Sequence, residues 1–223
     1  MSATRGVLFD LDGTLVDTAP SIARAVNRVL VDRRLPEQPE IIVRGWIGGG
    51  METLLRRSLV ALGIEHADSA ALGDFVAAFR VHYRDCLGEG AAPYPGMVEL
   101  LDQLQRNGTV LAIVTNKPRE FAEPLMARLG LDVRFRDMIC GDDLARSKPD
   151  PLPVTTLLGR LGLVAGDSWL VGDSIADMRA AHAAGVPAVL MGYGYGSEDP
   201  EARALAAAQA DDVAQLQAIL TPR

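Results

Sequence analysis

The chain has 223 residues, 48% of them hydrophobic, and carries a formal net charge of −7 with a pI near 5.0. This size and apolar content suit one large or two small globular domains with a buried core. The acidic balance argues against a nucleic-acid partner, which needs a basic surface. No apolar run approaches membrane-spanning length, which argues against a membrane protein.

The cysteines and the first residues indicate a reduced, cytoplasmic protein. The N-terminal residues do not follow the pattern of a secretory signal. Cys86 and Cys140 stand alone without a C-x-x-C spacing, so neither a disulfide framework nor a zinc site is indicated. Among 22 cationic residues only Lys117 and Lys148 are lysines, which singles both out for attention. Nothing in the sequence indicates an oligomeric state.

Residues 7–14, Val-Leu-Phe-Asp-Leu-Asp-Gly-Thr, predict a buried strand that ends in two carboxylates. Because side chains alternate along an extended chain, Asp10 and Asp12 point to the same side, and Gly13 permits a sharp turn after them. At about 4 Å their repulsion would cost on the order of 4 kcal/mol, so a proton or a cation is needed between them. Mg²⁺, a hard ion with oxygen ligands, fits this need. Taken alone, the stretch is equally compatible with a solvated Asp-rich turn.

The segment from 17 to 91 predicts an all-helical insertion. One helix begins with Asp17 or Thr18 as its cap and ends near Arg34. A glycine-rich turn over residues 44–50 carries a tryptophan, and leucines at helical spacing follow it. Another helix is expected over residues 69–87, and a linker rich in glycine and proline then leads back to the main domain.

From Met97 onward, helices alternate with short apolar runs. Strands are expected at 110–114, 138–140, 169–172 and 188–191, the last of these being the final strand. This alternation predicts an α/β fold with a doubly wound, mainly parallel, Rossmann-like sheet, formed by residues 1–16 and 92–223, with residues 17–91 as an inserted helical cap. Residues 192–196, Gly-Tyr-Gly-Tyr-Gly, are interpreted as a flexible loop.

Polar residues follow several of these strands. Ligands of such sheets bind outside the carboxyl ends of the strands, where Asp10, Asp12, Thr115, Asn116 and Asp173 would gather. A loop carrying Lys148 could approach the same edge. Carboxylates beside a lysine and a hydroxyl suit a phosphate and Mg²⁺ site. Each motif also has a structural explanation, such as helix capping or a plain turn. It is improbable that such an explanation holds for every motif at once.

These motifs resemble those of the haloacid dehalogenase superfamily of phosphatases. The four motifs appear in order as Asp10-Leu-Asp-Gly-Thr14, Thr115-Asn116, Lys148-Pro149 and Gly172-Asp-Ser-x-x-Asp177. They span most of the chain, and the helical insertion after the first one looks like the mobile cap of that superfamily. The resemblance therefore implies the same α/β core and a Mg²⁺-dependent hydrolase acting on a small phosphorylated metabolite.

Within the superfamily, the chain is most similar to phosphoglycolate phosphatases. The narrower match includes Trp46-Ile-Gly-Gly-Gly50, Val114-Thr-Asn-Lys-Pro118 and Gly192-Tyr-Gly-Tyr195. Where that group often has Trp-x-Gly-Asn-Gly, this chain has Gly49, so a substrate contact from the asparagine side chain is absent. The resemblance implies hydrolysis of a small monoester such as 2-phosphoglycolate.

The resemblance also implies roles for individual residues. Asp10 would attack phosphorus and form an aspartyl-phosphate, while Asp12 would protonate the leaving alkoxide and later deprotonate water. Asp10, Asp173 and the backbone carbonyl of Asp12 would hold Mg²⁺. The residues expected to bind the phosphoryl oxygens are Thr115, Asn116 and Lys148, and those expected to select the substrate from the cap are Arg44, Trp46 and the amides of Gly48–Gly50, Gly49 included.

Several rival functions share parts of this pattern. Asp12 argues against a dehalogenase, which has no alkoxide to protonate, and the cap lacks the lysine that a phosphonatase needs. A phosphosugar phosphatase, for example for N-acetylmuramate 6-phosphate, a pyrophosphatase and a phosphomutase stay open. A phospho-accepting signalling module also combines acids, a threonine and a lysine at strand ends, but it would be shorter and lack the insertion. A binding protein with an inactive site is disfavoured because no catalytic position is missing.

Overall fold

A six-stranded parallel sheet forms the centre of the protein. The computed structural model describes residues 6–64 and 69–221. The strands lie in the order β5–β4–β1–β6–β7–β8, and every neighbouring pair is parallel. Their bounds are β1 Gly6–Phe9, β4 Val110–Val114, β5 Asp137–Ile139, β6 Ser168–Gly172, β7 Ala188–Met191 and β8 Ala208–Ala210. All four residues of β1 are buried, as the apolar run predicted, because this strand lies between two others and is covered on both faces.

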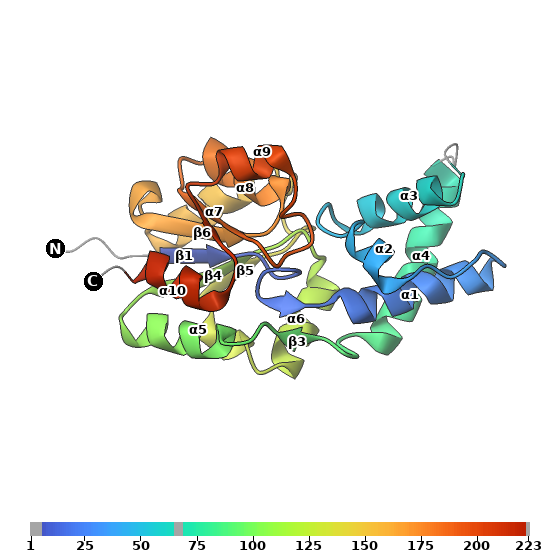
Figure 1. Ribbon diagram of the computed structural model, residues 1–223, viewed down its shortest axis with the longest axis horizontal. Coiled ribbons are helices and arrows are strands. Elements are labelled where there is room, and N and C mark those ends of the chain that lie inside the picture. The colour runs from blue at the N-terminus through green and yellow to red at the C-terminus, as the bar shows by residue number, and fades with distance from the viewer. Residues whose placement is uncertain (1–5, 65–68, 222–223) are drawn as a thin grey trace.

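Helices cover both faces of the sheet, which gives three layers (Figure 1). The face that carries Val7 and Phe9 packs against α5 (Met97–Arg106), α6 (Arg119–Arg128) and α10 (Val213–Leu220). The opposite face, which carries Leu8, packs against α7 (Leu152–Leu161), α8 (Ile175–Ala183) and α9 (Pro200–Leu205). Short 3₁₀ helices lie at η1 (Asp132–Arg134) and η2 (Ala165–Asp167). The doubly wound α/β core is therefore confirmed.

The helical insertion packs as a separate group beside the sheet's carboxyl edge, on the right in Figure 1. It contains α1 (Ala19–Asp32), α2 (Glu40–Arg44), α3 (Met51–Ala61) and α4 (Ser69–Cys86). At its base β2 (Val16–Asp17) pairs antiparallel with β3 (Ala92–Pro93). The division of the chain that we propose, 1–16 and 92–223 against 17–91, runs through this pair; of these residues 1–5, 65–68 and 222–223 lie outside the described part.

Two elements of the fold, besides the β2–β3 pair, differ from the sequence-based expectations. The strand at 188–191 was expected to be the last, and this was wrong, because β8 pairs with β7 beyond it and α9 and α10 also follow. The sequence of β8, Ala-Gln-Ala, has no β-branched or aromatic residue, so only its pairing with β7 makes it a strand. The short helix α2 was not expected either; it occupies residues just before the glycine-rich turn.

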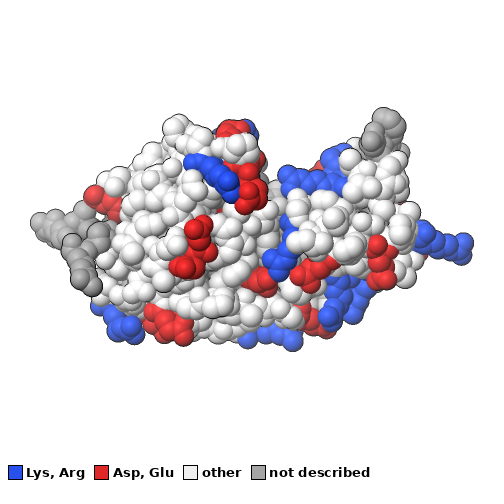
Figure 2. Space-filling model, viewed as in Figure 1, with Lys and Arg blue, Asp and Glu red and all other residues white. Residues whose placement is uncertain are grey.

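The surface has no single dominant charge on the face seen in Figure 2, where acidic and basic side chains are interspersed over both lobes. Across the described ranges 6–64 and 69–221, no helix combines the length and apolarity that a bilayer crossing requires.

Candidate active site

The carboxyl edge of the sheet brings three predicted residues together. Asp10 follows β1, Thr115 follows β4 and Asp173 follows β6, and β1 lies between β4 and β6. The backbone amide of Asp10 donates to Val171 O (2.9 Å) and that of Thr115 donates to Ile139 O (3.0 Å), so both residues continue the strand hydrogen bonding. Their side chains therefore start from rigid backbone rather than from loops.

The turn after β1 is held tightly against Asp173. Gly13 has φ +84°, a conformation that other residues rarely adopt, and a Cβ at this position would lie 2.5 Å from Asp173 Oδ2. The hydroxyl of Thr14 donates to the other carboxylate oxygen, Asp173 Oδ1, at 3.1 Å. The glycine predicted to permit a sharp turn thus also permits close approach of the first motif to the last.

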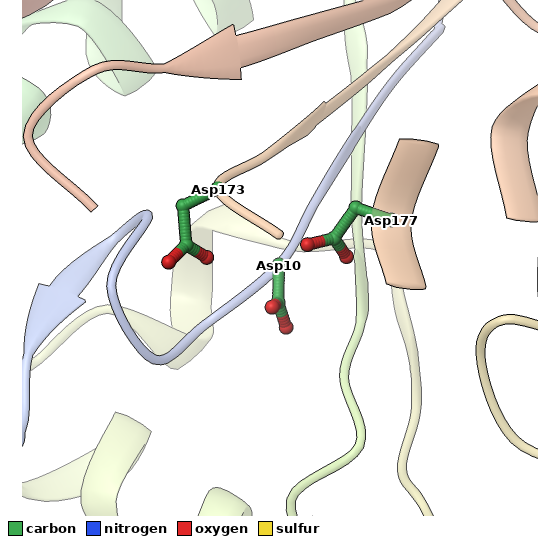
Figure 3. A group of neighbouring side chains, drawn as sticks. All are labelled: Asp10, Asp173 and Asp177. Carbon is green, nitrogen blue, oxygen red and sulfur yellow. The ribbon is translucent and has the colours of Figure 1, made fainter. Parts of the chain in front are cut away.

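Three buried carboxylates converge at this edge (Figure 3). Oxygen atoms of Asp10, Asp173 and Asp177 lie within 4.8 Å of one another. Burial raises the pKa of Asp10 to about 6, against the opposing effect of Lys148. Burial, together with the charges of Asp177 and Asp10, raises the pKa of Asp173 well above its ordinary range. Protons or a cation must offset this repulsion, and an all-oxygen set of buried acids fits a hard divalent metal ion.

Lys148 supplies the positive charge of this cluster. Its side chain is only 2% exposed, and its Nζ lies 3.0 Å from Asp10 Oδ1 and 2.5 Å from Asp177 Oδ1. It also donates to Val114 O at 2.6 Å. Burial alone would lower the pKa of Lys148, but Asp10 and Asp177 outweigh burial and raise it. Lys148 is therefore a fixed cation beside the carboxylate predicted to be the nucleophile, as expected from the sequence.

Asp12 lies apart from this cluster and contacts a second lysine. Its Oδ1 accepts from Thr18 Oγ1 (2.8 Å), and both of its oxygens accept from Lys117 Nζ at 3.0 Å. Thr18 is the N-cap residue of α1, as expected, but its side chain makes no capping hydrogen bond, because its hydroxyl donates to Asp12. The carboxylate of Asp12 is thus not part of the acidic cluster, and a metal contact from its backbone carbonyl stays a prediction.

A pocket opens between the sheet edge and the insertion. Core residues Asp10, Asp12, Thr115, Asn116 and Lys117 line one side of it. The other side is mainly apolar and comes from the insertion, including its glycine-rich turn. Its lining residues are Ile22, Ile47, Gly48, Gly50, Met51, Leu54 and Phe79. Both carboxylates expected to do chemistry therefore face one enclosed space.

Comparison with known proteins agrees with this arrangement. The haloacid dehalogenase-like hydrolase family matches residues 7–191. A plasmid-encoded phosphoglycolate phosphatase of Cupriavidus necator is 43% identical over 216 residues, which cover 97% of this chain and 93% of that protein. The chain belongs to the haloacid dehalogenase-like hydrolase family.

Other members of the family support the same relationship. A phosphoglycolate phosphatase of Yersinia pestis is 42% identical over 193 residues, covering 86% of this chain and 83% of that protein. The crystal structure of a predicted phosphoglycolate phosphatase from Haemophilus somnus superposes with a TM-score of 0.90 at 34% identity, covering 99% of this chain and 100% of that one.

Asn116 lies in the pocket wall but with an unexpected orientation. Its Nδ2 donates to Lys148 O at 2.9 Å, which ties the second motif of the hydrolase family to the third. Its Oδ1 is buried and has no hydrogen-bond partner among the residues described. Because its side-chain amide already donates to Lys148 O, a contact of Asn116 with a phosphoryl oxygen stays a prediction.

The residues predicted to select substrate lie only partly in the described pocket lining. Gly48 and Gly50 line the pocket, whereas Arg44, Trp46 and Gly49 are not among its described lining residues. Arg44 instead forms an ion pair with Asp17 at the base of the insertion, and its guanidinium lies 5.3 Å from the centre of the Tyr195 ring. A selective role of Arg44, Trp46 or Gly49 stays a prediction.

The loop at 192–196 is anchored, contrary to the interpretation as a flexible loop. Tyr195 N donates to Asp173 Oδ2 (2.7 Å), and the Tyr195 hydroxyl donates to Asp17 Oδ1 (2.8 Å). The Tyr193 hydroxyl donates to Thr14 O at 2.8 Å. A Cβ on Gly194 would lie 2.0 Å from that of Asp173, so only glycine allows this close packing. The sequence pattern includes both tyrosines but does not indicate their anchoring contacts.

Asp177 and Lys117 were not among the predicted site residues. Helix capping is one structural explanation for an acid at the position of Asp177, and Asp177 does accept from Ser174 N (3.1 Å) and Ser174 Oγ (2.6 Å). It also binds Lys148, which its place in the fourth family motif could have indicated. The scarcity of lysine in the chain was the feature of the sequence that could have indicated a role for Lys117.

Proposed function

We propose that this protein is a cytoplasmic, Mg²⁺-dependent phosphatase that hydrolyses 2-phosphoglycolate to glycolate and inorganic phosphate. The observation that carries the proposal is the placement of two carboxylates with different surroundings beside one pocket. Asp10 lies against Lys148 and the acidic cluster, whereas Asp12 lies against Lys117 and Thr18. Two carboxylates in different environments can perform different tasks in one reaction.

In the first step Asp10 is the nucleophile. An oxygen of its carboxylate attacks phosphorus, the bond from phosphorus to the ester oxygen breaks, and an aspartyl-phosphate forms. Asp12 donates a proton to the departing alkoxide, which leaves as a neutral hydroxyl. Lys148 and the hydroxyl of Thr115 hold the phosphoryl oxygens as their charge changes. Asp10 needs no proton transfer of its own, because it reacts as the carboxylate.

In the second step water replaces the enzyme oxygen on phosphorus. Asp12, now ionised, accepts a proton from the water as it attacks, and the bond from phosphorus to the Asp10 oxygen breaks. Inorganic phosphate leaves and both carboxyl groups return to their starting states. Asp10, Asp173 and the backbone carbonyl of Asp12 would hold Mg²⁺, which when bound supplies positive charge between the anionic nucleophile and the anionic phosphate.

The choice of 2-phosphoglycolate rests on the relatives and on the pocket. The proteins of Cupriavidus necator and Yersinia pestis that match most of the chain are both named phosphoglycolate phosphatase. The insertion lies over the carboxyl edge, so the glycine-rich turn reaches the core: a Cβ on Gly50 would lie 3.6 Å from Asn116 O. A small monoester suits an enclosed space of this kind better than a bulky one.

A substrate panel tests the proposal. The full chain is assayed with Mg²⁺ for phosphate release from 2-phosphoglycolate, N-acetylmuramate 6-phosphate, glucose 6-phosphate and pyrophosphate, with a chelator as the blank. We expect kcat/KM for 2-phosphoglycolate to exceed the others by at least about 10-fold, the order that pocket contacts can supply. A higher value for a sugar phosphate would overturn the substrate, and no release from any of them would overturn the enzyme class.

A further inference from the structure

The second lysine of the chain is buried at the boundary between insertion and core. The Lys117 side chain is 3% exposed, and its Nζ contacts both oxygens of Asp12 at 3.0 Å and the Tyr83 hydroxyl at 2.7 Å. Nζ also lies 4.8 Å from the centre of the Tyr83 ring. A buried cation is costly without partners, so this arrangement commits Lys117 to Asp12 and Tyr83.

The contacts of Asp12 are unequal at its two oxygens. Oδ1 accepts from both Thr18 and Lys117, while Oδ2 accepts, among the residues that the structure describes, from Lys117 only. Oδ2 therefore keeps acceptor capacity, and Asp12 lines the pocket. A general acid or base must hold one oxygen in line with the reacting group, and a carboxylate fixed by neighbours meets that need better than a free one.

We propose that Lys117 is a positioning residue that orients Asp12 for proton transfer, with Tyr83 as the support that holds the ammonium group in place. This inference rests on the proposed phosphatase reaction. Lys117 acts through Asp12 and not on the phosphoryl group, which is the task of Lys148 beside Asp10. The two lysines of the chain thus serve the two carboxylates of the reaction separately.

Tyr83 connects this arrangement to the insertion. It belongs to α4, it is buried, and its ring packs 5.1 Å from Phe79 on the same helix and 4.9 Å from Phe121 on α6 of the core. The hydroxyl at the end of this packed ring therefore reaches Lys117 only while α4 lies against α6. Orientation of Asp12 consequently depends on the contact between insertion and core.

Leaving groups of different basicity distinguish positioning of Asp12 from phosphate binding. An alkoxide such as that of glycolate needs a proton to leave, whereas p-nitrophenolate leaves without one. Loss of Asp12 orientation should therefore affect alkyl esters strongly and aryl esters weakly. Loss of a phosphate contact should affect both alike, because both esters carry the same phosphoryl group. The parameter to compare is kcat/KM, which reports the step that breaks the ester bond.

The experiment measures kcat/KM of wild type, Lys117→Met and Tyr83→Phe with Mg²⁺ for 2-phosphoglycolate and p-nitrophenyl phosphate. For Lys117→Met we expect a loss of at least about 30-fold on 2-phosphoglycolate and less than about 3-fold on p-nitrophenyl phosphate, within the range of general-acid effects. Tyr83→Phe should show the same selectivity with a smaller loss of roughly 3- to 10-fold, because it removes one support of the ammonium group. Asp12→Asn provides the reference pattern.

Two controls separate positioning from structural damage. The inhibition constant of inorganic phosphate should stay within about 3-fold of wild type in Lys117→Met, since the phosphoryl contacts remain. Arg179→Met removes an exposed ion pair with Glu201 between α8 and α9 and touches neither Asp12 nor the contact between α4 and α6, so it should retain activity on both esters. An equal loss on both esters in Lys117→Met, or a weakened phosphate affinity, would overturn the proposal.

Failure of the proposed function gives a different result. A wild type that hydrolyses p-nitrophenyl phosphate but not 2-phosphoglycolate contradicts the substrate alone, and the comparison is then made with the alkyl phosphate that it does hydrolyse. A wild type that hydrolyses no monoester contradicts both the function and the role of Lys117. Selective loss on the alkyl ester supports both.

Discussion

The core side and the insertion side of the pocket differ in the chemical character of the residues that line them. On the core side, charged groups are buried and held by several partners: Lys148 contacts Asp10, Asp177 and a backbone carbonyl. On the insertion side the lining is apolar or glycine, as at Ile47, Gly48 and Leu54. The charged side arises from rigid strand ends, and the apolar side from helices of the insertion and its glycine-rich turn.

This difference indicates that the core carries out the reaction and the insertion selects the substrate. The groups expected to make and break bonds are on the core, where their geometry is fixed by the sheet and by hydrogen bonds. The insertion contributes shape, and its contacts with the core also complete the environment of Asp12 through Tyr83. Changes on the core side should therefore abolish turnover, whereas changes on the insertion side should alter affinity or the preference for particular esters.

The largest effect is expected from the nucleophile. Asp10→Asn preserves the size of the side chain but removes its charge, and the amide cannot form the aspartyl-phosphate. We expect kcat to fall by at least about 10⁴-fold, the scale seen when a nucleophile is removed. Steady-state phosphate release with Mg²⁺ is the measurement. Asp32→Asn, on the exposed side of α1 beside His82, is the matched control and should leave turnover unchanged. Near-normal turnover of Asp10→Asn would exclude the covalent role.

Much of the core side could be predicted because topology alone brings its residues together. Asp10, Thr115 and Asp173 each follow a short apolar run, and parallel strands place their carboxyl ends at one edge whatever their separation in sequence. Lys148 was expected near them, and it is there. The presence of the motifs in order was enough to identify the fold and the edge of the sheet at which these residues meet.

The contacts of the insertion side could not be predicted in the same way. Lys117 and Tyr83 are 34 positions apart in sequence and meet only because α4 packs on α6. Tyr195 and Asp17 are 178 positions apart and meet across the base of the insertion. No local pattern encodes such pairs, because they depend on how two separately patterned units fit together. The short strand β8 was not predicted for a related reason. Its residues have a weak propensity for strands, and its pairing with β7 overrides that propensity.

A second prediction concerns the metal and follows from the pKa of Asp10. Its pKa in the metal-free protein is about 6, above the ordinary 3.8, so the folded state binds a proton that the unfolded state has already lost. The stability contributed by this group is present below about pH 4 and is lost as the pH rises through about 6, a change on the order of 3 kcal/mol. The raised pKa of Asp173 acts in the same direction.

Mg²⁺ should reverse this loss, because a bound cation takes the place of the proton. The measurement is the difference in Tm of the dialysed protein with and without Mg²⁺ between pH 5 and pH 8, which we expect to increase with pH. Comparing the two metal conditions at each pH cancels the contribution of acids away from the site. In Asp173→Asn the metal-free protein should be more stable near pH 8 than the wild type, because one carboxylate of the cluster is gone. A Mg²⁺ effect that is constant over this range would contradict the assignment of the acidic cluster as the metal site.

The smallest effect is expected at the base of the insertion. Arg44→Met removes the ion pair with Asp17 and the contact with the Tyr195 ring while keeping an extended side chain. Such partly exposed contacts contribute about 0 to 1 kcal/mol each, so the fraction of molecules with the insertion against the core should change only a few-fold. We expect KM to rise about 3- to 10-fold with kcat nearly unchanged, since the core residues are untouched.

Arg56→Met is the matched control for this change. Arg56 pairs with Glu52 on the exposed surface of α3, and its loss should leave KM at the wild-type value. An unchanged KM in Arg44→Met would mean that the pair with Asp17 does not help to hold the insertion in place. A fall in kcat of more than about 100-fold would instead indicate a direct contact of Arg44 with the reacting substrate, because only an interaction made in the transition state lowers kcat so far. In that case the insertion would take part in the chemistry, and the separation between the two sides of the pocket would not hold.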